Sequence, residues 1–288
     1  MRTSEWIQMG FATILAILAW ILQLTTRRRI VIAVLAVFAI LAVALARFSA
    51  HVFSPNQVSI IRDWLPVVLM LVPYWQTGQI FMGPNEKIQS RLLQMDQRLA
   101  NLLPPILRMS GRYTRQLMEW AYMFCYPLVP LGLAVLYATG LRQYSSTYWF
   151  IVLVPTYLCY AITPFVSALP PRSIARQDVA AATPNTGRVM NLWILKYGSI
   201  QAISFPSAHV ASALAIALVL LHFVPVAGAI FLIIAFLIAV AAVAGRYHYA
   251  LDVILGAVLA LIVYGMWVGH LIPSSLVTAP AAALATAL

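Results

Sequence analysis

Long apolar stretches alternate with short polar connections along this chain, as in a protein that crosses a membrane several times. Each apolar stretch has about the 20 residues that a helix needs to span a bilayer. We predict eight spans, near residues 6–24, 30–46, 58–82, 119–139, 147–166, 207–224, 226–245 and 250–272. The third span is the weakest, because it contains Arg62, Asp63 and Gln76.

Two connections differ from ordinary loops. Residues 85–118 mix basic residues with Leu, Ile and Met on either side of Pro104-Pro105, which predicts two amphipathic helices in the membrane interface. The basic residues there are Lys87, Arg91, Arg98, Arg108, Arg112 and Arg115. Residues 167–206 form the longest polar connection in the second half of the chain, and within them 189–203 are apolar enough to lie along the membrane surface.

The same pattern predicts an all-α polytopic membrane protein. We divide it into an N-terminal transmembrane helix pair (1–57), a six-helix membrane domain (58–272) and a C-terminal tail (273–288), to which we assign no function. The domain includes the interfacial segment 85–118 and the loop 167–206. Aromatic residues near span ends, such as Tyr148-Trp149, are expected to anchor the helices in the interface.

Composition excludes a soluble globular domain. The 288 residues are 63% hydrophobic and only 9% charged, whereas soluble domains average about 25% charged residues. The mean hydropathy is +0.90. Both cysteines, Cys125 and Cys159, lie inside apolar stretches without the spacing of metal ligands.

The net charge of +11 comes from 18 basic and 7 acidic residues. With eight spans, 14 of the 18 basic residues fall on one membrane face, in the loop after the first span, in 85–118, in 167–206 and at Arg246. The positive-inside rule makes that face cytoplasmic. Since no nucleic-acid motif accompanies the charge, we expect membrane lipids as partners and no nucleic acid.

Residues 204–252 carry the candidate chemistry. They begin with SFPSAH and end with GRYHYALD, and the 35 residues from Val210 to Ala244 between these motifs include no charged residue. Two spans joined at Pro225 return both motifs to the same face. Polar clusters at membrane depth are costly, so we interpret this one as a functional site.

The first element of the cluster is a histidine–carboxylate pair. His248 and Asp252 are four residues apart and share a helix face. A carboxylate that accepts from one imidazole nitrogen makes the other nitrogen a better base or nucleophile. Taken alone, the pair is explained as well by an N-terminal helix aspartate beside an interfacial histidine.

The second element is the start of the helix that follows SFPSAH. Pro206 suits a first helical turn and Ser204 is expected to cap it. The free amides of that turn, with the Ser207 hydroxyl, form an anion site, and His209 at its rim is placed to donate a proton. With charge from Arg172 and Arg246, this set favours phosphoryl transfer.

These segments resemble the type-2 phosphatidic acid phosphatase superfamily. FPSAH and RYHYALDVILG are similar to its second and third motifs, and ALPPR at 168–172 is similar to a divergent first motif, so that the resemblance covers roughly residues 119–272. It implies a six-helix core, here preceded by two extra helices. It also implies catalysis through a phosphohistidine, with no metal and no cofactor.

The resemblance implies a role for each candidate residue. His248 is the nucleophile, Asp252 orients it, and His209 protonates the leaving group. The phosphate is held by Ser207, Arg172 and Arg246. The usual third motif has an arginine six residues before the nucleophile, where this chain has Ala242.

Three functions remain open from the sequence. The first is an integral-membrane phosphatase that hydrolyses a lipid phosphate or a prenyl (di)phosphate. The second, favoured by the His-Tyr-x-x-Asp form of the third motif, is a headgroup phosphotransferase that moves a phosphoryl-alcohol between lipids. The third is a non-enzymatic protein that binds or transports phosphorylated lipids.

Overall fold

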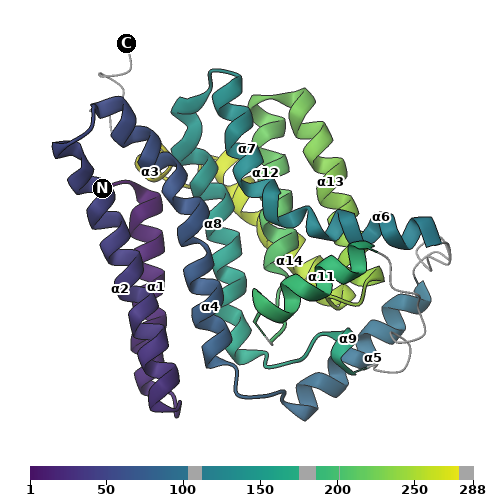
Figure 1. The fold of residues 1–288 in the computed structure, drawn as a ribbon. Coiled ribbons are helices and arrows are strands. Elements are labelled where there is room, and N and C mark those ends of the chain that lie inside the picture. The colour runs from purple at the N-terminus through teal and green to yellow at the C-terminus, as the bar shows by residue number, and fades with distance from the viewer. Residues whose placement is uncertain (103–111, 175–185, 201, 279–288) are drawn as a thin grey trace.

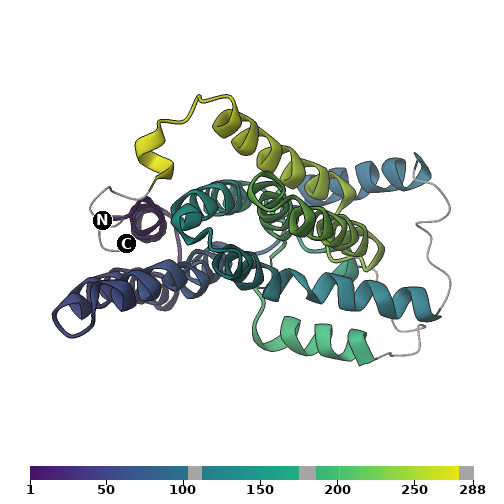
Figure 2. The same cartoon turned by 90° about the horizontal axis from the view of Figure 1, so that it is seen from above.

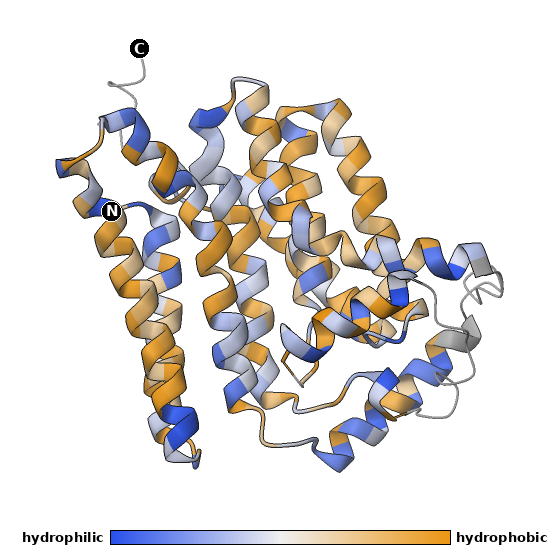
Figure 3. Cartoon of the chain, viewed as in Figure 1, coloured by the Kyte–Doolittle hydropathy of each residue, from blue (hydrophilic) through white to orange (hydrophobic). Residues whose placement is uncertain are grey.

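The computed structural model describes residues 1–102, 112–174, 186–200 and 202–278 (Figure 1). Arg108, Arg176, Asp178 and the last ten residues of the tail lie outside these ranges. All longer regular elements of the described part are helices, which confirms the all-α prediction. Figure 3 shows hydrophobic residues over most of α2 (Thr26–Phe48) and α13 (Pro225–Ala244), and hydrophilic residues at helix ends and along α5 (Glu86–Leu102).

The first four helices are α1 (Thr3–Ile21), α2, α3 (Pro55–Leu69) and α4 (Leu71–Ile80). After α5 come α6 (Arg112–Met123), α7 (Cys125–Ala138), α8 (Ser145–Ile162), α9 (Pro171–Ile174) and α11 (Thr186–Tyr197). The last are α12 (Ala208–Phe223), α13, α14 (Ala250–Val268) and α15 (Ser274–Val277). Within the described residues, six helical segments are long and apolar enough to cross a membrane, or seven with the bent α6–α7 pair.

The doubtful third span is present as a helical segment from Pro55 to Ile80. It consists of α3 and α4 with Met70 between them. The interruption has a local cause, because Pro73 lacks the N–H that would bond to the Leu69 carbonyl one turn earlier. The predicted span is therefore confirmed in length and apolar character.

The predicted span 119–139 corresponds to a bent helix pair. Its first residues belong to α6, and α6 meets α7 at an angle of 56° at Phe124. Pro127 has no N–H to bond to the Met123 carbonyl, so the helix breaks there. Consequently α6, like α5, belongs to the predicted amphipathic segment, and only α7 continues as the apolar helix.

Helix α12 lies at the centre of the bundle and packs against α7, α8, α13 and α14. Its buried positions are mostly small, including Ala208, Ala211 and Ala215. Small residues let neighbouring helices approach closely within a membrane. With 16 residues, α12 is shorter than a typical span.

Helices α1 and α2 pack on one side of the bundle, remote from α13 (Figures 1 and 2). α1 contacts α2, α4 and α8. Buried ion pairs fix its first turn: Arg2 Nη1 lies 2.5 Å from Asp63 Oδ1, and Arg62 Nε lies 2.6 Å from Glu5 Oε1. Arg142 from the α7–α8 connection also bonds to Asp63, at 3.0 Å.

Tyr148 and Trp149 are core residues, so the expectation that they anchor the interface is wrong. Both are almost completely buried. The Tyr148 hydroxyl donates to the Val129 carbonyl and the Trp149 indole N–H donates to the Asp63 carbonyl, at 2.6 and 2.7 Å. Because these polar tips find carbonyl partners inside the bundle, the rings need no contact with the interface.

Candidate active site

Backbone hydrogen bonds bring the three predicted motif segments together at one end of the bundle. The amide of Arg172, in α9, donates to the Arg246 carbonyl at 3.0 Å. The amide of Ser207, just before α12, donates to the Asp252 carbonyl in α14 at the same distance. A third bond, from Ile203 N to Ala168 O at 3.1 Å, ties the first segment to the second.

His248 and Asp252 are in contact as predicted, but they do not share a helix face, because His248 lies in the loop before α14. His248 Nδ1 lies 3.1 Å from Asp252 Oδ2, and the residues are 4% and 0% exposed. The loop between α13 and α14 holds His248 in place, because the amides of Tyr247 and His248 both donate to the Ala242 carbonyl. Nδ1 faces the carboxylate, which leaves Nε2 as the nitrogen for chemistry.

His209 stands beside this pair, in the first turn of α12. Its ring centroid lies 5.8 Å from that of His248, with the two planes nearly perpendicular at 83°. The two tyrosines of α6 and α7, Tyr122 and Tyr126, each present a ring 5.8 Å from the His209 ring. The second and third motifs therefore place both histidines in one group.

A close helix approach makes this arrangement possible. A Cβ atom at Gly256 of α14 would lie 2.4 Å from the Ser207 carbonyl oxygen. Backbone atoms occupy that space, so a side chain at this position would push α14 away from the start of α12. Gly256 thereby sets the separation of Asp252 from the α12 start.

Arg172 completes the group from α9. Its guanidinium carbon lies 4.8 Å from the centroid of the Tyr247 ring, in cation–π range. With His209 and His248, Arg172 lines a cavity of about 20 Å³. Its Nη1 is buried and has no hydrogen-bond partner among the described residues.

A buried cationic N–H without a partner is unfavourable. Burial also lowers the pKa of Arg172, since it disfavours the charged form. An anion bound in the cavity would supply the missing acceptor and offset the burial of the charge. The Arg172 guanidinium is thus placed as an anion-binding group beside two histidines.

The start of α12 differs from the prediction in detail. The helix begins at Ala208 and its N-cap is Ser207, whose hydroxyl accepts from Val210 N at 3.5 Å. Pro206 lies before the helix, and Ser204 contacts Ala208 N at 3.5 Å without being the N-cap residue. Because Ser207 has the extended backbone of an N-cap, the first helical turn starts two residues after Pro206. The phosphate role of Ser207 stays a prediction.

Arg246 is placed differently from Arg172. It is exposed, has a φ of 58°, and is not among the residues that line the small cavity. Its carbonyl joins the motif segments by accepting from Arg172 N. Its predicted contact with phosphate stays a prediction, and Arg172 is the arginine that reaches the histidines.

Two further residues near the site were missed from the sequence, Tyr122 and Tyr247. Their rings stack with centroids 4.0 Å apart and planes within 4°. Burial raises the pKa of Tyr247, which keeps its hydroxyl protonated. The available signal was the position of Tyr247 directly before His248.

A polar network behind Tyr247 connects α6 to α11. Arg188 Nη1 donates to Glu119 Oε1 at 2.9 Å and to the Tyr247 hydroxyl at 3.1 Å. The Asn191 amide donates to Glu119 Oε2 at 2.7 Å. Glu119 is the last charged residue before a long uncharged stretch of sequence, and this position could have identified it as a candidate.

Helix α5 holds the backbone on both sides of the site. Gln89 accepts from Leu169 N at 2.8 Å and donates to the Tyr249 hydroxyl. Asp96 Oδ1 accepts from Ala250 N at 2.9 Å, at the start of α14. The interfacial helix therefore clamps the segments that carry Arg172 and His248.

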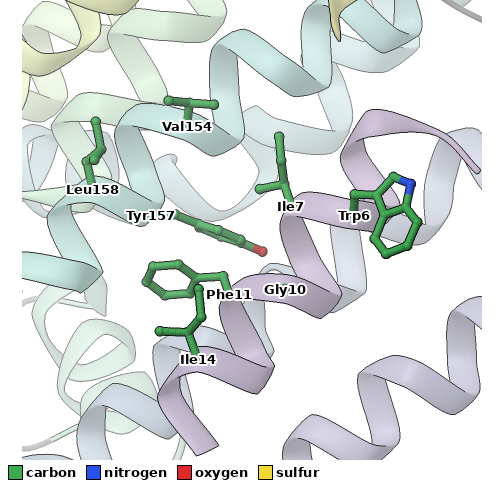
Figure 4. Close-up of a pocket in the computed structure, with 8 residues that line it drawn as sticks. All are labelled: Trp6, Ile7, Gly10, Phe11, Ile14, Val154, Tyr157 and Leu158. Carbon is green, nitrogen blue, oxygen red and sulfur yellow. The ribbon is translucent and has the colours of Figure 1, made fainter. Parts of the chain in front are cut away.

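A larger groove lies away from these residues, between α1 and α8 (Figure 4). It has a volume of about 330 Å³ and its lining side chains are apolar or aromatic, among them Ile7, Phe11 and Tyr157. Its chemistry gives no reason to place a reaction there. Within the described ranges, no group of three or more His, Cys, Asp or Glu side chains has the arrangement of a metal site.

Comparison with known proteins agrees with the motifs. The family model described as the PAP2 superfamily matches residues 90–266, more than half of the chain. No curated protein and no solved structure matches. The match runs from α5 to α14 and includes all six candidate residues. The chain therefore belongs to the PAP2 (type-2 phosphatidic acid phosphatase) superfamily.

Proposed function

We propose that this protein is a membrane lipid phosphatase that hydrolyses a lipid phosphate or a prenyl (di)phosphate. Membership of the PAP2 superfamily supports a phosphatase-type lipid enzyme. The observation that carries the more specific proposal is the buried, unpartnered Nη1 of Arg172 in the cavity that it shares with His209 and His248. A phosphate oxygen is the natural acceptor for that N–H.

The first step forms a bond between His248 Nε2 and phosphorus. The phosphorus–oxygen bond to the lipid breaks, and its electron pair stays on the leaving oxygen, which takes a proton from His209 in its imidazolium form, the form that the bound phosphate anion favours. Asp252 stabilises the positive charge on the imidazole. Burial and the nearby charge of Arg172 lower the pKa of His248, so it is neutral and ready to attack at neutral pH.

The second step returns the enzyme to its starting state. A water oxygen attacks phosphorus, the nitrogen–phosphorus bond breaks, and His209 accepts the proton of the water. Inorganic phosphate leaves. Arg172 neutralises phosphate oxygens through both steps, where charge stabilisation is the main need of phosphoryl transfer.

Substrate entry requires a movement. A cavity of about 20 Å³ has room for about one water molecule, which is too little for a phosphate. Leu195 and Ser199, at the end of α11 and beyond it, form part of its wall. We expect this wall to shift when the lipid headgroup enters.

The proposal includes a cytoplasmic active site. Three contacts link the basic segments to the catalytic loops at one end of the bundle. They join Arg28 to Phe81, Asn85 to Ser167 and Arg172 to Arg246. The positive-inside rule assigns such an end to the cytoplasm.

The test is release of inorganic phosphate from a panel of phosphatidic acids and prenyl phosphates by purified protein in detergent. Wild type should release phosphate in the presence of chelator as in its absence. His248→Ala should release none. His222→Ala is the matched control, because His222 packs against Trp267 with ring centroids 4.7 Å apart and lies far along α12 from His209. Wild-type-like release by His248→Ala would contradict the mechanism.

The second candidate is a headgroup phosphotransferase. The deep burial of His248 favours it, because a site closed to water suits a lipid alcohol as acceptor. It predicts a new phospholipid only when an acceptor lipid is added, and no free phosphate. Tight binding of a phosphorylated lipid without any product would instead support the non-enzymatic alternative.

A further inference from the structure

A second groove adjoins the active site on the side of the N-terminal helices. It has a volume of about 460 Å³ and lies between α2, α4 and the residues after α11. Volumes of roughly 300–1,000 Å³ are typical of ligand pockets. Its lining is mixed, with apolar side chains such as Val31 and Leu35 and polar ones such as Arg28 and Gln79.

The groove follows α2 from its basic first turn toward its apolar part. Arg28, Val31 and Leu35 follow one face of α2 over about 10 Å, at 1.5 Å of rise per residue. Arg28 Nη1 donates to the Phe81 carbonyl at 2.7 Å, just beyond the end of α4. The charged end of the groove therefore lies beside the end of α4.

A thin wall separates the groove from the catalytic cavity. Ser199 lines both spaces. Two side chains of α4 hold this wall: the Tyr74 hydroxyl donates to Ser199 Oγ at 2.9 Å, and the Trp75 indole N–H donates to Gly198 O at 3.2 Å. Tyr74 itself also lines the catalytic cavity.

The groove between α1 and α8 lacks these properties. Its lining residues are apolar or aromatic, and none of them lines the catalytic cavity. It has no cation to meet a headgroup. Of the two grooves, only that of α2 and α4 combines an apolar track, a cationic end and a wall shared with the catalytic histidines.

We propose that this groove binds the hydrocarbon chain of the phosphorylated lipid substrate, with the anionic headgroup directed past Ser199 to Arg172. The inference rests on the proposed function and extends it. The α2 and α4 sides of the groove lie outside the residues 90–266 that match the family model. Chain-length preference is thus a property that the N-terminal helices add to the catalytic core.

The test compares long-chain with dihexanoyl phosphatidic acid as substrates in mixed micelles. Val31→Trp fills the groove and should lower kcat/KM for the long chain about tenfold, as expected when roughly two methylene groups lose their burial. Hydrolysis of the short-chain substrate should not change. Val37→Trp is the control, since Val37 is 52% exposed, does not line the groove and lies across α2 from Leu35, and it should leave both rates unchanged.

A second measurement separates this proposal from the function on which it rests. A long-chain phosphatidic acid with a diazirine near the chain end should crosslink to α2 or α4 of the wild type, and less to Val31→Trp. Crosslinking there without any phosphate release would contradict the proposed function and support the groove. Phosphate release with crosslinks only elsewhere, or equal losses on both substrates in Val31→Trp, would overturn the groove.

Discussion

At the scale of single residues, the account depends most on Arg172. Its Nη1 is buried without a described partner, whereas Arg246 is exposed and does not line the cavity. Arg172→Gln should lower kcat/KM about 100-fold or more, the usual cost of removing one preorganised charge-stabilising donor. Arg246→Gln should cost much less. Steady-state phosphate release by the two variants checks this order, and a reversed order would transfer the phosphate-binding role to Arg246.

The pH response of His248 follows from the same contact. His248 attacks in its neutral form, and burial and the Arg172 charge lower its pKa. It therefore stays neutral as pH falls through the usual histidine range near 6.5, and is protonated only at lower pH. Arg172→Gln removes one of the two causes, so the pKa should rise. Histidine ¹⁵N NMR titration of both proteins measures it, and an unchanged pKa would show that Arg172 does not act on His248.

The contacts between single residues differ in how far apart the two residues lie along the chain, and this decides whether the sequence predicts them. The contact of His248 with Asp252 was predicted for the wrong reason, because His248 lies in the loop before α14 and shares no helix face with Asp252. The contact of Arg172 with Tyr247 joins two loops far apart in sequence, so no local pattern reveals it. The N-cap is Ser207, which also has a hydroxyl, and not Ser204, although the Ser204 hydroxyl accepts from Ala208 N.

At the scale of elements, α5 is the helix whose role the sequence left open. Asp96 Oδ1 accepts from Ala250 N and thereby caps α14 from outside the helix. Asp96→Ala should destabilise the protein by about 1 kcal/mol, as loss of a cap does, and should lower kcat. Asp96→Asn keeps an acceptor oxygen and should restore most of both. Thermal unfolding and kcat, both measured in detergent, test this role of Asp96. Equal effects of the two variants would show that the bond to Ala250 N does not hold α14 in place.

The helices themselves were largely predictable. The length of the apolar stretches predicted the spans, and the mixture of basic and apolar residues in 85–118 predicted the amphipathic helices there. The break between α6 and α7 could have been predicted from Pro127, because proline lacks the N–H of a helical hydrogen bond. It was missed because hydropathy alone gives no sign of such a break. The burial of Tyr148 and Trp149 was not predictable, because it depends on carbonyl partners in other helices.

At the scale of the whole molecule, a buried ion cluster joins the N-terminal helices to the rest. Asp63, in α3, accepts from Arg2, just before α1, and from Arg142. Asp63→Ala leaves two cations without this carboxylate and should cost about 3–5 kcal/mol. Arg47→Ala, at an exposed position, should cost less than about 0.5 kcal/mol. Thermal unfolding compares them, and similar melting temperatures would show that the cluster does not stabilise the assembly.

The order of the motifs along the chain predicted that the catalytic segments meet, and the fold brings them together. The groove between α2 and α4 was not predictable, since it depends on how the N-terminal helices pack on the core. The division of the chain near residue 57 stays a prediction.

The central claim is that phosphate passes through His248. The most direct measurement is rapid acid-free quenching of the protein with a ³²P-labelled lipid phosphate, followed by peptide mapping. The account predicts a base-stable, acid-labile label on the peptide that contains His248, present in wild type and His222→Ala and absent in His248→Ala. Label on another residue, or steady phosphate release by His248→Ala, would contradict it.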